Sequence, residues 1–335
     1  MNTPQHQPYT AASNRYDKMV YNRLGRSSVS LSAISLGLWH NFGSNDPYDR
    51  GRDMIHFAFD NGINHFDLAN NYGPIAGSAE SNFRRILRES LTPYRDELMI
   101  STKAGHEMWA GPLGGNSSRK HLFASIDQSL HRLGLDYVDI FYTHRYDGVT
   151  PIEETAQALT DIVRSGRAIY IGISKYPPRE AAQLYSLLSA ERTPAVVAQY
   201  RYSLFERTIE RESLAQAAEA GAGVVAFSPL AQGLLTDKYL QGVPKNSRAA
   251  SASKFLTTEA LTPERVEQIK ALNAIAESRN EPLSQMALAW ALRDERVSSL
   301  IIGASSVEQI AENIGAVTAA PFTAEEIAQI DKITL

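Results

Sequence analysis

Four polar side chains in this chain of 335 residues have the types and spacing of a site that could donate a proton. Asp67 and Tyr72 lie in the segment HFDLANNYG, Lys103 ends ISTK and His144 ends FYTH. An ammonium beside a phenol stabilises the phenolate and lowers the tyrosine pKa, and a carboxylate keeps the lysine charged. The pattern therefore predicts that Tyr72 is a proton donor near neutral pH.

Taken singly, each of these side chains has an ordinary structural explanation. An aspartate or lysine after a strand is often a cap or a solvated charge, and a lone histidine is usually a hydrogen-bonded core residue. Chemistry is favoured because the four follow three successive predicted strands. A metal site built from Asp67 and His144 is the main chemical alternative. No H-x-H or H-E-x-x-H pair supports it, so no metal is expected.

The elements that must position these residues are read from an alternation of short apolar runs with longer helical patterns. Several runs are apolar almost throughout, as expected of strands covered on both faces. A helical pattern follows nearly every one, which favours an α/β fold, a closed (β/α)8 barrel of the TIM type, over an open doubly wound sheet. The eight predicted strands are 33–38, 63–68, 98–102, 138–142, 168–173, 195–198, 224–227 and 299–302.

Three stretches depart from this alternation. Residues 104–120 are rich in glycine and contain Met108 and Trp109, which look exposed, and residues 231–262 carry several lysines and arginines. Both stretches follow predicted strands, so they are expected at the carboxyl ends of the barrel strands, where long loops usually carry function. Residues 20–31 predict a β-hairpin that closes the opposite end. We expect residues 1–335 to form one domain.

The composition excludes several classes of function. The 33 lysines and arginines nearly balance the 37 aspartates and glutamates, and 43% of the residues are hydrophobic, as in globular proteins. No block of like charge points to a nucleic-acid partner. No apolar run approaches the roughly 20 residues of a membrane span or resembles a secretory signal, so a cytoplasmic protein without a membrane partner is expected. The absence of cysteine excludes thiol chemistry.

The chain resembles the aldo-keto reductases over nearly its whole length. The resemblance rests on the segments SLGLWHNFG, HFDLANNYGP, ISTKAG, DYVDIFY, PLAQGLLT and GASSVEQ. Within the family, the chain most resembles the bacterial reductases of L-glyceraldehyde 3-phosphate or methylglyoxal. These reductases are similar in turn to the β subunits of voltage-gated potassium channels. The resemblance implies reduction of a small aldehyde or ketone to an alcohol with hydride from NADPH, in a homo-oligomer of four or more subunits. No Rossmann or P-loop motif is present, so the nucleotide would bind in another manner.

Carried over residue by residue, the resemblance implies that Tyr72 protonates the developing alkoxide, with Lys103 and Asp67 tuning it, while His144 orients the carbonyl. Phe227 would stack on the nicotinamide ring. The other implied cofactor contacts are Trp39, Ser174, Gln199, Ser228, Leu230, Gln232, Gly233, Lys238, Arg248, Ser305, Gln309, Glu312 and Asn313. The implied substrate pocket is formed by Trp39, Tyr72, Met108, Trp109 and His144.

One difference from the family and one alternative function remain at this stage. Lys175 replaces the asparagine that often follows the serine of the fifth strand in the wider family. The alternative function is a regulatory subunit that senses NADPH, as the channel β subunits would. His144 completes the set of four and favours turnover. Aldehyde-dependent consumption of NADPH distinguishes the two functions.

Overall fold

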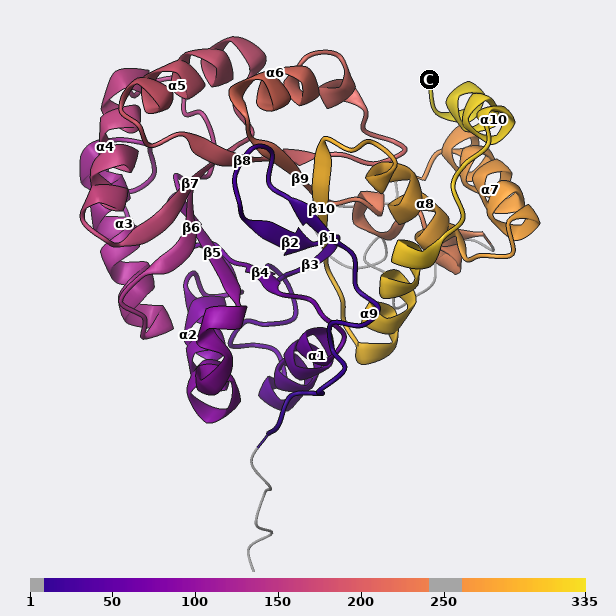
Figure 1. The fold of residues 1–335 in the computed structure, drawn as a ribbon, viewed down its shortest axis with the longest axis horizontal. Helices are drawn as coiled ribbons and strands as arrows, with labels where there is room; N and C mark the ends of the chain where they lie inside the picture. Colours follow the sequence, from indigo (N-terminus) through magenta and orange to yellow (C-terminus); the bar gives the residue numbers. More distant parts are fainter. Residues whose placement is uncertain (1–8, 241–260) are drawn as a thin grey trace, which may run out of the picture.

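A closed barrel of eight parallel strands forms the centre of the molecule (Figure 1). The structure is a computed structural model, and it describes residues 9–240 and 261–335. The strands follow one another around the barrel in the order β10-β3-β4-β5-β6-β7-β8-β9. They are β3 (Ile34–Gly37), β4 (His65–Asp67), β5 (Met99–Ala104), β6 (Val138–Thr143), β7 (Ala168–Ser174), β8 (Ala195–Arg201), β9 (Gly223–Phe227) and β10 (Val297–Ile302). Each predicted run coincides with one of these strands, which confirms the (β/α)8 barrel.

The strands are apolar because they are covered on both faces. Every residue of β6 and β10 is buried, as expected where helices pack outside the barrel and side chains fill its interior. Neighbouring strands are paired in parallel, for example Lys103 with Tyr142 and Phe227 with Ile301. Parallel pairing brings the carboxyl ends of all eight strands to one rim of the barrel.

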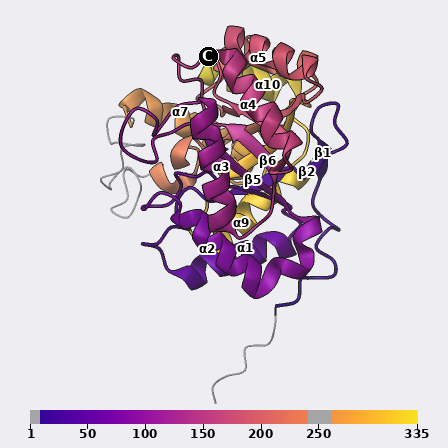
Figure 2. The same cartoon turned by 90° about the vertical axis from the view of Figure 1, so that its left-hand side faces the viewer.

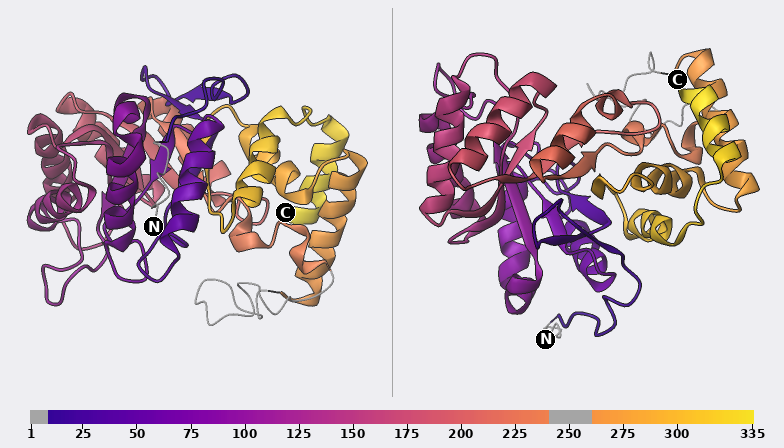
Figure 3. Two further views of the ribbon diagram at one scale, coloured as in Figure 1. Left: turned by 90° about the horizontal axis from the view of Figure 1, so that it is seen from below. Right: turned by 45° about the horizontal axis from the view of Figure 1, so that its top comes forward.

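Helices cover the outside of the barrel. Those beside it are α1 (Tyr48–Asp60), α2 (Ser78–Ile86), α3 (Arg119–Leu133), α4 (Ile152–Arg164), α5 (Pro178–Ala190), α6 (Ser213–Ala220), α8 (Leu283–Leu292) and α9 (Val307–Ile314). Figure 2 shows α3 and α4 in front of β5 and β6. The helices α7 (Pro263–Ser278) and α10 (Ala324–Thr334) pack on each other farther out (Figure 3). No helix of the described residues is long and apolar enough to cross a membrane.

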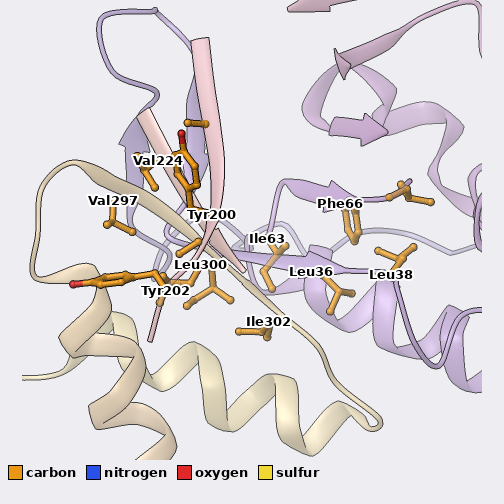
Figure 4. Close-up of a cluster of buried hydrophobic side chains, with 14 of the residues drawn as sticks. Leu36, Leu38, Ile63, Phe66, Tyr200, Tyr202, Val224, Val297, Leu300 and Ile302 are labelled. Atoms are coloured by element: carbon orange, nitrogen blue, oxygen red, sulfur yellow. The ribbon is translucent and has the colours of Figure 1, made fainter. Parts of the chain in front are cut away.

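Two hydrophobic cores result from this arrangement. The larger lies between the strands and the helices, and Figure 4 shows a part of it that includes Leu36, Phe66 and Leu300. The smaller lies inside the barrel and includes Ile140, Val225 and Ile301. The interior core must be closed from water at the end opposite the carboxyl rim.

An antiparallel hairpin of β1 (Tyr21–Arg23) and β2 (Ser30–Ser32) closes that end, as the sequence predicted for residues 20–31. Its apolar residues Leu24, Val29 and Leu31 are buried in the interior core. The turn uses Gly25 at φ +53°, where a Cβ would lie 2.3 Å from the carbonyl oxygen of Gly221. Gly221 shortly precedes β9, so the hairpin lies against the amino ends of the strands.

Burial of the hairpin should contribute directly to stability. We expect Val29→Ala to lower the free energy of unfolding by about 2 kcal/mol, because Val29 is 7% exposed inside the core. Val20→Ala is the matched control, since Val20 is 45% exposed just before β1, and its effect should be about 0.5 kcal/mol or less. Urea unfolding followed by circular dichroism measures both. Equal losses would show that the hairpin does not close the core.

Candidate active site

A buried ion pair lies at the carboxyl ends of β4 and β5. The Nζ atom of Lys103 is 2.6 Å from Oδ2 of Asp67, and the two side chains are 0% and 2% exposed. The ammonium also donates to the carbonyl oxygen of Leu68 at 2.7 Å. Burial lowers the pKa of Lys103, and the charge of Asp67 opposes that shift. Unpaired charges at this depth would cost several kcal/mol, so each partner makes the other tolerable.

The second carboxylate oxygen of Asp67 is also fully engaged. Oδ1 accepts hydrogen bonds from the Ser101 hydroxyl at 2.8 Å and from the Gln199 side-chain amide at 3.0 Å. Ser101 lies on the neighbouring strand β5, whereas Gln199 reaches Asp67 from β8, which is not a neighbour of β4 in the barrel. The carboxylate is therefore fixed on both oxygens, which buried charges require.

A chain of buried polar side chains connects Asp67 to the hairpin end of the barrel. Ser101 also lies 3.0 Å from Nε2 of His65, whose Nδ1 lies 2.8 Å from the Ser35 hydroxyl. Ser35 in turn contacts Ser299 at 2.6 Å, and Ser299 donates to a carbonyl oxygen of β2. Burial lowers the pKa of His65 to about 4, so its ring is neutral at pH 7. The sequence analysis missed this chain.

Tyr72 lies directly above the ion pair. Its hydroxyl is 3.3 Å from Nζ of Lys103, within the reach of a hydrogen bond. Burial raises the pKa of Tyr72 well above its ordinary value, and the charges of Asp67 and Tyr142 raise it further. The expectation that Lys103 lowers this pKa is therefore wrong for the structure, because Asp67 neutralises the ammonium and burial penalises the phenolate. Tyr72 is held as a protonated phenol.

His144 and Trp39 flank the Tyr72 ring. The ring centroids of Tyr72 and His144 are 6.0 Å apart in an edge-to-face arrangement, and those of Trp39 and Tyr72 are 6.3 Å apart. Burial lowers the pKa of His144 well below its usual range, and the charges of Lys103 and Lys175 add to the shift. Its Nδ1 atom has no hydrogen-bond partner among the described residues. A neutral imidazole here can donate one N–H to a ligand.

Two further residues lie beside His144 that the predicted site did not include. The His106 ring is 4.4 Å from the His144 ring, and Nε2 of His106 is 3.3 Å from Nζ of Lys175. Burial and nearby cations lower the pKa of His106 to about 4. The only sequence signal for His106 was its place three residues after Lys103, at the start of a loop.

The ends of β7, β8 and β9 fit a nicotinamide. Ser174 ends β7 fully buried, and its hydroxyl has no partner among the described residues. Gln199 is paired with Ser174 across the strands, and Phe227 ends β9 half-buried. A carboxamide can satisfy the Ser174 hydroxyl, and an aromatic ring can stack on Phe227.

The segment after β9 has the backbone of a ligand-binding turn. Ser228, Ala231, Gln232 and Gly233 have φ of +54°, +47°, +62° and +98°. Left-handed conformations at non-glycine residues cost energy and are concentrated at functional turns. The Gln232 amide donates to the Ser228 hydroxyl at 2.9 Å. A Cβ at Gly233 would meet no atom of the described residues within 4 Å.

The remaining predicted cofactor residues lie along the same part of the rim. Leu230 lies within the left-handed turn, between Ser228 and Ala231, and Lys238 is exposed in the short 3-10 helix Asp237–Tyr239. At the start of α9, the side-chain oxygen of Gln309 accepts from the backbone N–H of Ser305 at 2.9 Å. The Glu312 carboxylate accepts a hydrogen bond from the Ser284 hydroxyl. The Asn313 side chain is buried. Arg248 lies outside the described residues.

The two predicted substrate residues of the loop after β5 are only half-buried. The backbone N–H of Met108 donates to Gly114 within the loop at 2.8 Å. The Trp109 ring packs at a tilt against His121 of α3, with ring centroids 4.8 Å apart. The structure therefore brings Asp67, Tyr72, Lys103, His144, Gln199 and Trp39 together, whereas Trp109 packs beside α3. Within the described residues, no group of three or more His, Asp or Glu side chains is arranged to hold a metal ion.

Comparisons with known proteins agree with this geometry. The model of the aldo/keto reductase family matches residues 33–335. Two relatives named L-glyceraldehyde 3-phosphate reductase, from Escherichia coli O157:H7 and from Escherichia coli strain K12, are each 49% identical over 328 residues. These matches cover 97% of this chain and 95% of each relative. The similarity therefore extends over the barrel and its rim.

The ion pair should dominate the stability of the rim. Asp67→Asn leaves the Lys103 ammonium buried without a counter-charge, so we expect the free energy of unfolding to fall by about 3 to 5 kcal/mol. Asp96→Asn is the matched control, because Asp96 is exposed, and its effect should stay below about 0.5 kcal/mol. Adding Lys103→Met to Asp67→Asn should restore most of the loss. If Asp67→Asn is as stable as Asp96→Asn in urea, the pair does not have this role.

Proposed function

We propose that this chain, which belongs to the aldo/keto reductase family and is an oxidoreductase that acts on carbonyl compounds, reduces small aldehydes to alcohols with hydride from NADPH. The substrates we propose are glyceraldehyde 3-phosphate, methylglyoxal and similar aldehydes or ketones. The observation that carries the proposal is the protonated phenol of Tyr72 within 3.3 Å of a buried lysine at the barrel rim. The names of the two relatives support the substrate class.

The proton chemistry follows from the charges around Tyr72. When bound, the nicotinamide supplies a hydride to the carbonyl carbon. Tyr72 gives its hydroxyl proton to the carbonyl oxygen, and the Lys103 ammonium stabilises the phenolate that this leaves. Asp67 keeps Lys103 charged through the 2.6 Å contact. The Lys103 ammonium lies 3.3 Å from the Tyr72 oxygen, so it stabilises the negative charge that develops on that oxygen during proton transfer.

His144 positions the carbonyl in this proposal. Its ring is neutral and packs edge-to-face with Tyr72, so an imidazole N–H can donate to the same oxygen that receives the Tyr72 proton. The Trp39 ring also lies beside the Tyr72 ring, and it would limit the space for the substrate. The half-buried Met108 and Trp109 would line the outer part of the pocket.

The cofactor would extend along the rim from β7 to β10. Ser174 and Gln199 would bind the carboxamide, and Phe227 would stack on the ring. The pyrophosphate would lie on the turn formed by Ser228, Leu230, Gln232 and Gly233, with Lys238 nearby and Arg248 on the 2′-phosphate. The adenosine would lie against Ser305, Gln309, Glu312 and Asn313.

Three broader predictions belong with this proposal. We propose a cytoplasmic protein, a single domain over residues 1–335 and a homo-oligomer of four or more subunits. The regulatory alternative, a subunit that senses NADPH without turnover, gains no support from a particular observation. It is separated from the enzyme by the experiment that follows.

The test is the loss of NADPH absorbance when the protein is mixed with methylglyoxal or glyceraldehyde 3-phosphate. We expect oxidation that depends on the aldehyde. Binding of NADPH with no oxidation across a panel of small aldehydes would overturn the enzymatic proposal and would favour the sensor.

Removal of one hydroxyl tests the proton donor. Tyr72→Phe should lower kcat at least about a hundredfold, because the carbonyl oxygen loses its acid, while the Kd for NADPH stays unchanged. Tyr16→Phe is the matched control, since Tyr16 is 41% exposed on the N-terminal segment. Stopped-flow absorbance gives kcat, and nicotinamide fluorescence gives Kd. Normal turnover by Tyr72→Phe would refute the assignment.

Cofactor preference tests Arg248. Because an arginine fork suits a phosphate, Arg248→Ala should reduce the ratio of kcat/KM for NADPH over NADH about tenfold or more. Arg88→Ala, on an exposed side chain of the π-helical segment Leu87–Leu91 that continues α2, serves as the control. A ratio equal to that of the unmodified protein would show that Arg248 does not bind the 2′-phosphate.

A further inference from the structure

A group of basic side chains lies at the carboxyl ends of β5 to β8. His106, Arg145, Lys175 and Arg201 come from these four adjacent strands in turn. Lys175 lies 3.3 Å from His106, and the charges of Arg145 and Arg201 act on Lys175. We call these four residues the basic cluster. None of them is part of the predicted site.

Within the described residues, the basic cluster has no balancing acid. The Arg145 guanidinium donates to the carbonyl oxygens of Gly105 and Gly115, and the Arg201 guanidinium lies 5.8 Å from the centre of the Phe227 ring. Each charge that acts on Lys175 there is a cation. Like charges held together are unfavourable, so the cluster is complemented best by an anion.

The state of Lys175 agrees with an exposed anion site. Partial burial and the neighbouring cations lower its pKa to about 8, so the ammonium is still mostly protonated at pH 7. Its backbone has φ of +55°, a conformation that costs energy for a side chain such as lysine. His106 is neutral and can accept a hydrogen bond from the ammonium. The remaining ammonium protons are available to a ligand.

The position of the cluster decides which molecule the anion belongs to. His106 packs on His144, and His144 packs on Tyr72, so only two rings separate Lys175 from the proton donor. The turn after β9, where we place the pyrophosphate, and the start of α9 after β10, where we place the adenosine, follow the next two strands around the barrel (Figure 1). His106 and Lys175 therefore lie on the substrate side, and Arg201 borders the proposed nicotinamide position at Phe227.

We propose that Lys175, Arg201 and Arg145 form a subsite for the anionic group, a phosphate or a carboxylate, of a short aldehyde whose carbonyl lies at Tyr72. The inference rests on the proposed aldehyde reduction and specifies its substrate class. Lys175 and Arg201 contact the anion, and Arg145 adds charge while its guanidinium secures the loop of Gly105 and Gly115. The subsite selects charged aldehydes over neutral ones of the same length.

The experiment compares three aldehydes in the same assay. Glyceraldehyde 3-phosphate carries a phosphate, succinic semialdehyde carries a carboxylate, and glyceraldehyde is the neutral match. We expect kcat/KM to be higher for at least one charged aldehyde than for glyceraldehyde, and the larger of the two values identifies the anion. Equal kcat/KM for all three would overturn the subsite and leave the proposed function intact, whereas no reduction of any aldehyde would instead refute the proposed function.

Substitution of Lys175 tests the residues. Lys175→Asn removes the charge and suits the positive φ, because asparagine adopts that conformation readily. It should lower the preference for the charged aldehyde about tenfold or more, mainly through KM. Lys175→Arg should retain most of the preference. Lys18→Asn is the matched control, since Lys18 is exposed beside the amino end of the barrel.

Two binding measurements separate the subsite from the cofactor site. Inorganic phosphate should inhibit competitively with the charged aldehyde, and this inhibition should weaken in Lys175→Asn. The Kd for NADPH, from nicotinamide fluorescence, should stay the same in that variant. If Lys175→Asn instead weakens NADPH binding tenfold and reduces all three aldehydes less well to the same degree, the cluster serves the cofactor and the proposal is wrong.

Discussion

The buried ion pair of Lys103 and Asp67 determines how the rest of the rim is built. Two charges at 0% and 2% exposure are stable only when both are paired and hydrogen-bonded. Ser101, Gln199 and the Leu68 carbonyl supply the additional hydrogen bonds, and they come from three different parts of the barrel. The pair is neutral as a whole, so Tyr72 beside it remains a phenol. The same pair keeps a cation within 3.3 Å of the phenolate that proton transfer would produce.

The ion pair depends in turn on the sealed interior of the barrel. The hairpin covers the amino ends of the strands and buries the interior core. The chain of His65, Ser35, Ser101 and Ser299 runs from the hairpin to Asp67 with every member fully buried. Polar networks of this kind stabilise one arrangement when all their groups are satisfied. Closure at one end thus orients the chemistry at the other, because the chain of hydrogen bonds joins the hairpin to Asp67.

Much of the fold could be predicted because barrel strands buried on both faces are short apolar runs. The polar residues Asp67, Lys103 and His144 stand out because each interrupts or follows such a run. His65 and Ser101 were missed because a single polar residue inside a strand does not show which neighbours it will meet. The direction of the Tyr72 pKa was wrong because residue types alone do not give burial. Trp109 could not be placed because loop residues have no periodic pattern to follow.

The most direct test of the central claim is the ionisation of Tyr72 itself. The protein is labelled with ¹³C at the tyrosine Cζ atoms, the Tyr72 resonance is identified from the Tyr72→Phe spectrum, and its shift is followed with pH. Because burial and the charge of Asp67 raise the pKa of Tyr72, we expect no phenolate signal from Tyr72 up to pH 10. A titration of this resonance near neutral pH would show that the Lys103 charge prevails over burial and over Asp67, and it would contradict the account.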